Sequence, residues 1–180
     1  KMDVGYVNGK PFFSIAGIGF DAKVAYDFEQ DPRRGFFTYF KHILHNYFQY
    51  QSCNYHITYD GQTIDTQAFF ITFANSSQWG YNVRIAPMAS MHDGLLDVCM
   101  VKRPKLLLKM LNVDLPKLLS SRFDKSSIVQ YLACQRISIE PVVPHPIYLH
   151  IDGDTAGQVE KVEIEMKREV LNAVVPLGLI

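Results

Sequence analysis

Residues 55–74, YHITYDGQTIDTQAFFITFA, are the part of the chain that most directly indicates its fold class. From Tyr55 to Tyr59, apolar side chains alternate with polar ones, which is the pattern of a strand with one buried face. Asp60-Gly61 then supplies residues that adopt the positive φ angles of a two-residue hairpin turn. Residues 66–74 are predicted to be the returning strand. The stretch therefore favours an antiparallel sheet.

Outside this stretch, short segments with strand patterns dominate the sequence. They are predicted at residues 12–16, 98–101, 128–139, 147–151, 159–166 and 171–176. Helical patterns are confined to two blocks: residues 20–48, which Asp31-Pro32 interrupts, and a segment that begins at Pro104 and restarts at Pro116. Strands and helices do not alternate as they do in a parallel α/β fold. The sequence thus predicts a mainly β domain, an antiparallel β-sandwich with two inserted helical segments.

Composition and charge exclude several classes of protein. The chain has 180 residues, of which 48% are hydrophobic, and 18 Lys plus Arg balance 18 Asp plus Glu. This composition predicts one folded domain rather than a disordered chain. Zero net charge without a long basic run gives no expectation of a nucleic-acid partner. The three cysteines lie far apart, so we expect buried free thiols in a reducing, cytoplasmic compartment.

A glycine-containing segment, Gly17-Ile18-Gly19-Phe20-Asp21-Ala22, follows the first of these strands and precedes the first helix. It matches the loose form of a dinucleotide-binding fingerprint, which requires a parallel βαβ unit closed by an acidic residue. The aromatic helix that follows does not lead to a second parallel strand. We therefore favour a tight strand-to-helix turn over a nucleotide site.

Residues 85–98, IAPMASMHDGLLDV, place an Asp93-Gly94 turn between two apolar segments. Such a turn can direct a carboxylate and neighbouring backbone carbonyls at one point, an all-oxygen arrangement that Mg²⁺ or Ca²⁺ prefers. The alternative is an Asp-Gly turn whose carboxylate binds its own backbone.

Residues 150–154, HIDGD, end another predicted strand. Asp152 and Asp154 flank a glycine, so both carboxylates can lie near one point, where their like charges raise the pKa of one of them toward that of a general base. Here too, a purely structural hairpin turn is the alternative.

The predicted helix over residues 36–48 is apolar around much of its circumference. Phe36, Phe40, Ile43 and Tyr47 fall on one helical face. Core packing explains such a face by default, but it can also form one wall of a groove for a hydrophobic ligand. The aromatic residues that would extend this wall are Tyr50, Trp79 and Tyr81.

Four segments follow one another in a distinctive order along the chain. They are residues 12–22 (FFSIAGIGFDA), 73–75 (FAN), 85–98 as quoted above, and 151–154 (IDGD). This order resembles the C-terminal domain of the diacylglycerol kinase and sphingosine kinase family, which includes bacterial lipid kinases. The resemblance covers nearly the whole chain, and the segment leading to Asp93-Gly94 is its most specific part.

The resemblance implies ATP-dependent transfer of a γ-phosphoryl group to the hydroxyl of a diacylglycerol or sphingoid-type lipid. It places Ser90, Asp93 and the carbonyl of Leu95 around a Mg²⁺ that holds the local structure. The family's general base is a glutamate directly after an Asp-Gly pair, and this sequence has Asp154 there, one methylene shorter. Asp152 can share the role, and the aromatic helix would help to enclose the acyl chains.

The resemblance also implies a second domain. The family's GGDGT-type phosphate loop belongs to an N-terminal nucleotide-binding domain and does not occur in these 180 residues. We therefore expect this chain to be the lipid-side half of a two-domain kinase, with ATP held mainly by the absent half, and to be inactive alone. Its expected partners are the lipid substrate, that N-terminal domain and, peripherally, the inner face of the membrane. Pairing of exposed strand edges into a homodimer is a further alternative.

Two other functions stay open at this point. One is a non-catalytic β-sandwich that binds a lipid or an acyl chain, its acidic turns being structural. The other is a kinase of the same superfamily that acts on a soluble nucleotide, which the aromatic helix disfavours.

Overall fold

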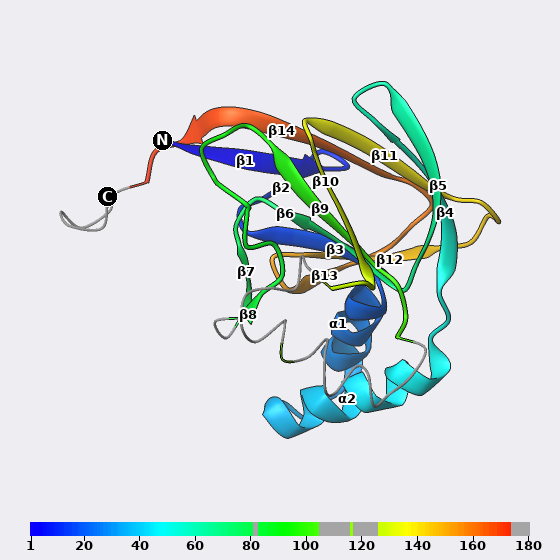
Figure 1. Cartoon of the computed structure of the whole chain (residues 1–180). Helices are drawn as coiled ribbons and strands as arrows, with labels where there is room; N and C mark the ends of the chain where they lie inside the picture. Colours follow the sequence, from blue (N-terminus) through cyan, green and yellow to red (C-terminus); the bar gives the residue numbers. More distant parts are fainter. Residues whose placement is uncertain (81–82, 105–115, 117–125, 174–180) are drawn as a thin grey trace.

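A computed structural model of the chain describes residues 1–80, 83–104, 116 and 126–173. Two antiparallel six-stranded sheets lie face to face (Figure 1). Sheet A has the strand order β2 (Lys10–Phe12), β1 (Met2–Val7), β14 (Val162–Leu171), β11 (Arg136–Pro141), β4 (Cys53–Tyr59), β5 (Gln62–Ala68). Sheet B has the order β10 (Val129–Cys134), β9 (Leu96–Val101), β6 (Phe70–Ala74), β3 (Ile15–Gly19), β12 (Ile147–Ile151), β13 (Asp154–Val159). A small pair, β7 (Gln78–Gly80) and β8 (Val83–Arg84), stands apart. The predicted β-sandwich is confirmed.

The main core fills the space between the two sheets. Inward-facing side chains of sheet A, such as Tyr55 and Ile57, meet those of sheet B, such as Ile71 and Phe73. Residues of β4 point alternately into this core and out to solvent, as their sequence pattern predicts. The middle strands β3, β6 and β9 are buried along their whole length, because sheet B is covered on both faces.

Two helices cover the outer face of sheet B (Figure 1). Helix α1 (Phe20–Gln30) contacts β3, β12 and β13, and α2 (Phe36–Gln49) lies against α1. A second apolar cluster forms between sheet and helices, where Phe20 stacks on Phe69 with ring centroids 4.5 Å apart and Tyr47 meets both rings edge-on. The first predicted helical block is therefore confirmed as two helices, which Asp31 and Pro32 separate. The second block, from Pro104 onward, lies almost entirely outside the described residues.

The predicted hairpin turn is also confirmed, but its returning strand, predicted over residues 66–74, is β5 and begins at Gln62. Tyr59 pairs with Gln62 across Asp60 (φ 43°) and Gly61 (φ 82°), so both turn residues have the left-handed conformation.

Several stretches predicted as single strands each divide into two. The chain passes from sheet A to sheet B between β5 and β6, from sheet B to sheet A between β10 and β11, and again from sheet B to sheet A between β13 and β14. Residues 12–16 divide in the same way, between β2 and β3. Gln135 marks one break, where the Asp60 carboxylate accepts hydrogen bonds from the backbone N–H groups of Gln135 and Arg136. The alternation of apolar and polar residues carries no signal for a change of sheet, which explains why the prediction was wrong there. The strand predicted at residues 171–176 is described only to residue 173, and β14 ends at Leu171.

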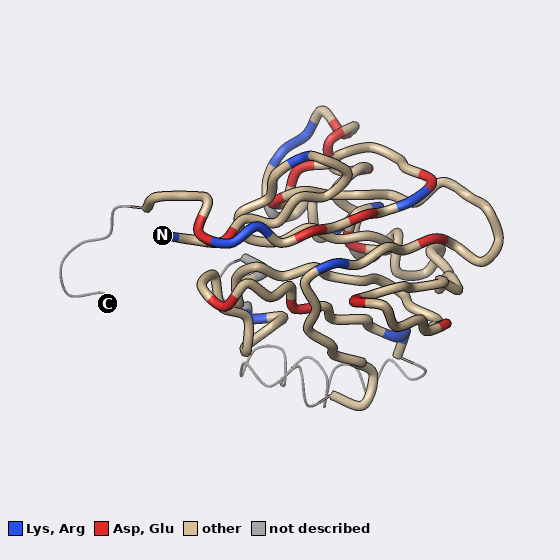
Figure 2. Tube along the Cα trace, turned by 90° about the horizontal axis from the view of Figure 1, so that it is seen from above, with Lys and Arg blue, Asp and Glu red and all other residues tan. Residues whose placement is uncertain are grey.

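Acidic and basic positions are intermixed along both sheets (Figure 2). All three cysteines are free thiols, with Cys99 and Cys134 buried and Cys53 half-buried. No helix in the described part of the chain is long and apolar enough to cross a bilayer.

Candidate functional site

The turn between β12 and β13 carries the two carboxylates predicted as catalytic. Ile151 pairs with Asp154 across Asp152 (φ 49°) and Gly153 (φ 94°), so the turn has the same left-handed geometry as the 60–61 hairpin. The Asp152 carboxylate accepts hydrogen bonds from the backbone N–H groups of three consecutive residues: Phe13 at 2.9 Å, Ser14 at 2.8 Å and Ile15 at 3.0 Å. Asp152 therefore ties the turn to the start of β3.

Asp154 differs from Asp152 in its contacts. Its side chain is exposed and has no hydrogen-bond or ion-pair partner among the residues that the structure describes. The resemblance put the base at Asp154 and let Asp152 share the role, and the two carboxylates differ in their contacts: backbone amides occupy Asp152, and Asp154 is available to a ligand.

Asp154 lines a groove of about 660 Å³ between this turn and the helices. One wall is Gly153, Asp154 and Thr155, and the other comes from the end of α1 and the start of α2. This second wall consists of Ala25, Phe28 and Glu29 of α1, Arg34 and Gly35 of the segment between the helices, and Tyr39 of α2. The groove therefore combines two carboxylates, those of Glu29 and Asp154, with one guanidinium and two aromatic rings.

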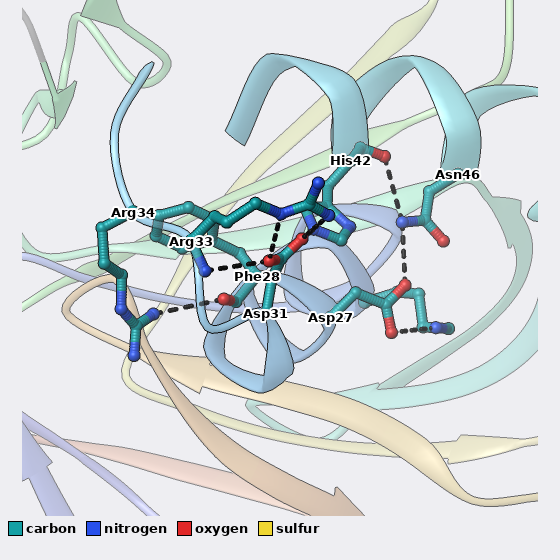
Figure 3. Close-up of polar contacts among 8 residues, drawn as sticks. Asp27, Phe28, Asp31, Arg33, Arg34, His42 and Asn46 are labelled. Carbon is teal, nitrogen blue, oxygen red and sulfur yellow. Dashed lines mark hydrogen bonds and ion pairs between the residues drawn. The ribbon is translucent and has the colours of Figure 1, made fainter. Parts of the chain in front are cut away.

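The helical wall is held together by a polar network (Figure 3). Asp31, just after α1, accepts hydrogen bonds from the backbone N–H, Nε and Nη2 of Arg33, each at 3.0 Å, and contacts His42 Nε2 on α2 at 3.1 Å. The side-chain and backbone hydrogen bonds from Arg33 hold the pKa of Asp31 well below its usual range. One turn earlier, Asp27 accepts a hydrogen bond from Asn46 Nδ2 at 2.9 Å. These contacts fix the angle between the two helices.

The four residues predicted to bind lipid lie in different environments. Ile43 and Tyr47 pack inward against the second apolar cluster, where Tyr50 lies as well. Phe40 is 46% exposed, and the side chain of Phe36 lies outside the described residues, as do those of Trp79 and Tyr81. Among the three described, Phe40 is the one that offers apolar surface to a ligand.

The sequence offers Phe37 and Phe48 as further aromatic surface of this helix, and the structure shows that they are the most exposed apolar side chains of α2. Phe37 is 87% exposed, Phe48 is 70% exposed, and Leu44 lies between them at 47%. With Phe40, they follow the spacing of three and four residues that places side chains on one helical face. The same spacing could have identified this outer face in the sequence, but not that it faces solvent.

The predicted metal loop, residues 90–95, is a tight turn. The Asp93 carboxylate accepts a hydrogen bond from the N–H of Leu95 at 3.0 Å, and Ser90 Oγ accepts one from His92 at 3.3 Å. Asp3 pins the loop, since its carboxylate accepts the Gly94 N–H at 2.7 Å. Ser90 Oγ, the Asp93 carboxylate and the Leu95 carbonyl retain free lone pairs. They are oxygen donors of the kind that Mg²⁺ prefers, and because only one of them is a carboxylate, a bound Mg²⁺ would keep several waters. The described residues include no cluster of three or more acidic, His or Cys side chains that could hold a metal.

Asp97, at the start of β9, is buried near this loop and is hydrogen-bonded by the hydroxyl of Tyr131. Burial, with a smaller contribution from the charge of Asp93, raises the pKa of Asp97 to about 7.

The glycine-containing segment 17–22 has a structural role. β3 pairs antiparallel with both neighbours, so no parallel βαβ unit exists around it. Gly17 lies next to a buried contact between His150 Nε2 and Asp21 Oδ2, which are 3.2 Å apart. A Cβ at Gly17 would lie 2.3 Å from that His150 nitrogen. Gly19, at φ 100°, is the N-cap of α1. Both glycines are required by close approach or backbone conformation.

Comparison with known proteins places this fold in a family. Residues 14–175 match the family described as the YegS C-terminal NAD kinase beta sandwich-like domain. The diacylglycerol kinase of Bacillus subtilis (strain 168) is 25% identical over 173 residues, which cover 94% of this chain and 55% of that protein. Two crystal structures of Bacillus anthracis str. Sterne proteins that carry the diacylglycerol kinase name align with TM-scores of 0.65 and 0.58, each at 19% identity. They cover 93% of this chain, which corresponds to 53% and 50% of those chains.

The chain thus spans about half the length of the relatives that it matches. The family match extends over most of its residues and includes the β3 segment, the 90–95 loop and the 152–154 turn. The chain therefore belongs to the YegS C-terminal NAD kinase beta sandwich-like domain family, and its predicted resemblance to the C-terminal domain of diacylglycerol kinases is confirmed.

Proposed function

We propose that this chain is the lipid-side domain of an ATP-dependent kinase that phosphorylates the hydroxyl of a diacylglycerol or a sphingoid-type lipid. The observation that carries the proposal is the position of Asp154, an available carboxylate in a groove whose opposite wall carries Phe28 and Tyr39. The volume of the groove, about 660 Å³, lies within the range of small-molecule sites. A general base must come within about 2.6 to 3.2 Å of the hydroxyl, directly or through one water.

In the proposed reaction, Asp154 accepts the proton of the lipid hydroxyl while the hydroxyl oxygen attacks the γ-phosphorus of ATP. The bond from the γ-phosphorus to the bridging oxygen breaks, ADP leaves, and a phosphate monoester of the lipid forms. Asp152 keeps the turn in place through its three backbone hydrogen bonds. We therefore assign the proton transfer to Asp154 and the positioning of the turn to Asp152.

We assign ATP binding mainly to an N-terminal domain of the full-length protein. The relatives are about twice as long as this chain, and no GGDGT-type loop occurs in its sequence. Mg²⁺ would be held in this domain by Ser90, Asp93 and the Leu95 carbonyl, where it would neutralise the Asp93 carboxylate and keep the loop in shape.

The acyl chains would leave the groove along the exposed face of α2. Tyr39 lines the groove, and Phe40 and Leu44 continue from it along the same helix. A lipid held in this way keeps its hydroxyl near Asp154 while its chains remain in a bilayer, which is consistent with peripheral contact at the inner face of a membrane.

The test uses the full-length protein with ATP and three acceptors: dioctanoylglycerol, a sphingoid base, and NAD as a soluble nucleotide. We expect phosphorylation of one of the two lipids, and a loss of about 10²-fold or more in kcat for Asp154→Asn, the usual value of a general base. Asp65→Asn is the matched control, because Asp65 is an exposed carboxylate on sheet A that pairs with His56. Unchanged activity in Asp154→Asn would remove the base assignment, and phosphorylation of NAD alone would replace the lipid by a nucleotide.

The exposed face of α2 also supports a second candidate, a lipid-binding module without catalysis. In that case dioctanoylglycerol would bind this chain with the same affinity in wild type and Asp154→Asn, and the full-length protein would phosphorylate none of the acceptors.

A further inference from the structure

Arg34 is the cation of the groove that contains Asp154. The charged residues that line this groove are Glu29, Arg34 and Asp154. Two other cations, in α1 and in the segment after it, are already paired: Lys23 with Asp27, and Arg33 with Asp31. Within the described part of the chain, Arg34 forms no ion pair with a carboxylate. Its charge is therefore available to a ligand in the groove.

Arg34 is held in place without an ion pair to any residue that the structure describes. Its Nη1 donates a hydrogen bond to the backbone carbonyl of Phe28 at 3.2 Å, and the guanidinium lies 5.4 Å from the centroid of the Phe28 ring (Figure 3). A guanidinium has five N–H donors, so this contact leaves several unused. The Asp31 network described above holds the segment between the helices and so holds Arg34 at the rim of the groove.

We propose that Arg34 binds the phosphate group of the monoester that the reaction forms. This inference rests on the proposed function. The hydroxyl oxygen that Asp154 deprotonates becomes the ester oxygen of the product, so the new phosphate must lie in the same groove as two carboxylates. The carboxylates of Glu29 and Asp154 repel the phosphate, so a cation is needed to compensate for them. Arginine binds phosphate oxygens through paired N–H groups better than lysine does.

Two neighbours of Arg34 influence this binding in opposite directions. Glu29 lines the groove and repels a phosphate. Gly35, the N-cap of the 14-residue helix α2, lines it as well, and no side chain caps the first turn, so the helix dipole adds to the positive potential around Arg34. The substitution Arg34→Gln removes the charge of Arg34 and leaves Glu29 and the helix dipole in place, so it tests the contribution of Arg34 alone.

A binding experiment on the 180-residue chain separates the sources of phosphate. The probes are glycerol 3-phosphate, glycerol as its uncharged match, and ATP, with NMR detection of the arginine Nε–Hε signals. We expect glycerol 3-phosphate to shift the Arg34 signal and glycerol to leave it unchanged. Arg34→Gln should weaken glycerol 3-phosphate binding about tenfold or more, Arg34→Lys should give an intermediate affinity, and Glu29→Gln should tighten binding. Arg136→Gln, on sheet A, is the matched control.

Each result supports or overturns the inference. Equal affinity of wild type and Arg34→Gln for glycerol 3-phosphate overturns it, and so does a loss confined to ATP, which would assign Arg34 to the nucleotide. In the full-length enzyme, we expect Arg34→Gln to raise the inhibition constant of the phosphorylated lipid by a similar factor. If Asp154→Asn is inactive but Arg34→Gln has the wild-type kcat and product inhibition, this inference fails and the proposed function stands. If glycerol 3-phosphate shifts Arg34 but no lipid is phosphorylated, the proposed function fails and the phosphate site stands.

Discussion

Replacing Asp152 and Asp154 by asparagine, one at a time, should separate folding from catalysis in the β12–β13 turn. The Asp152 carboxylate accepts three backbone N–H groups at 2.8 to 3.0 Å. An asparagine keeps one oxygen but turns the other into an NH₂ group, which then faces a backbone donor. Asp154 has no such contacts in the described structure. The first substitution should therefore destabilise the fold, and the second should not.

The magnitude follows from these hydrogen bonds. A hydrogen bond to a charged group contributes about 1.5 to 3 kcal/mol, and the exposure of Asp152 to solvent reduces this value. We expect Asp152→Asn to lower the free energy of unfolding by about 2 kcal/mol, which corresponds to a Tm lower by about 4 to 8 °C for a chain of this length. Asp154→Asn should change the free energy of unfolding by about 0.5 kcal/mol or less, as exposed substitutions usually do.

The assay combines urea unfolding of this chain with phosphoryl transfer by the full-length protein. We expect Asp152→Asn to shift the urea midpoint with an unchanged m value and to retain activity below its Tm. Asp154→Asn should unfold like the wild type and lose activity, and Asp65→Asn should change neither property. A fully folded Asp152→Asn protein that is as inactive as Asp154→Asn would refute the reasoning, because both carboxylates would then take part in proton transfer. Equal stability of Asp152→Asn and wild type would refute the structural role of the three hydrogen bonds.

Three further predictions concern the loop and the core. Asp97 has a pKa raised from 3.8 to about 7 by burial, so the folded state retains its proton longer than the unfolded state does. In EDTA, the free energy of unfolding should therefore fall as pH rises from 4 to 7, by up to about 1.4 kcal/mol per pH unit from this group, and urea titrations of Asp97→Asn should lack this decrease. Mg²⁺ should raise the Tm of the wild type in proportion to ln(1 + [Mg²⁺]/Kd). Calorimetry should show no such rise for Asp93→Ala, and a rise as large as that of the wild type would exclude Asp93 as a ligand. Gly17→Ala should lower the free energy of unfolding by about 1 to 3 kcal/mol through overpacking, because its Cβ would lie 2.3 Å from His150 Nε2. In a His150→Ala background, urea unfolding should show a smaller loss of stability from Gly17→Ala. If the two substitutions instead lower the free energy of unfolding additively, the proposed clash is contradicted.

Much of the fold could be predicted from short-range patterns. Alternation from Tyr55 to Tyr59 and the Asp60-Gly61 turn predicted β4 and the hairpin turn that follows it, because side-chain direction and turn conformation depend on adjacent residues. The returning strand was predicted from residue 66, but β5 begins at Gln62. Asp31-Pro32 likewise predicted the break between α1 and α2. The points at which the chain changes sheets, such as Phe69 and Gln135, could not be predicted, since they depend on hydrogen bonds to residues distant in sequence.

The candidate site shows the same division. Its residue types were visible in the sequence: an acidic pair at a turn, an oxygen-rich loop and an aromatic helix. The sequence did not show which face of that helix is exposed, because either side of a helix that is apolar around most of its circumference can be the buried one. The structure places Ile43 and Tyr47 inside and leaves Phe37 and Phe48 in solvent.

The sequence by itself determined the class of fold, the family resemblance and the two acidic turns, because these depend on residues close together in the chain. Only the tertiary structure decided that Asp152 serves the backbone while Asp154 faces a groove, and that Arg34 lies in the same groove. The amides that bind Asp152 are more than 130 positions away in the sequence, and Arg34 is 120 positions from Asp154. Such contacts arise where sheet B and the helices pack together, and no local pattern of residues encodes them.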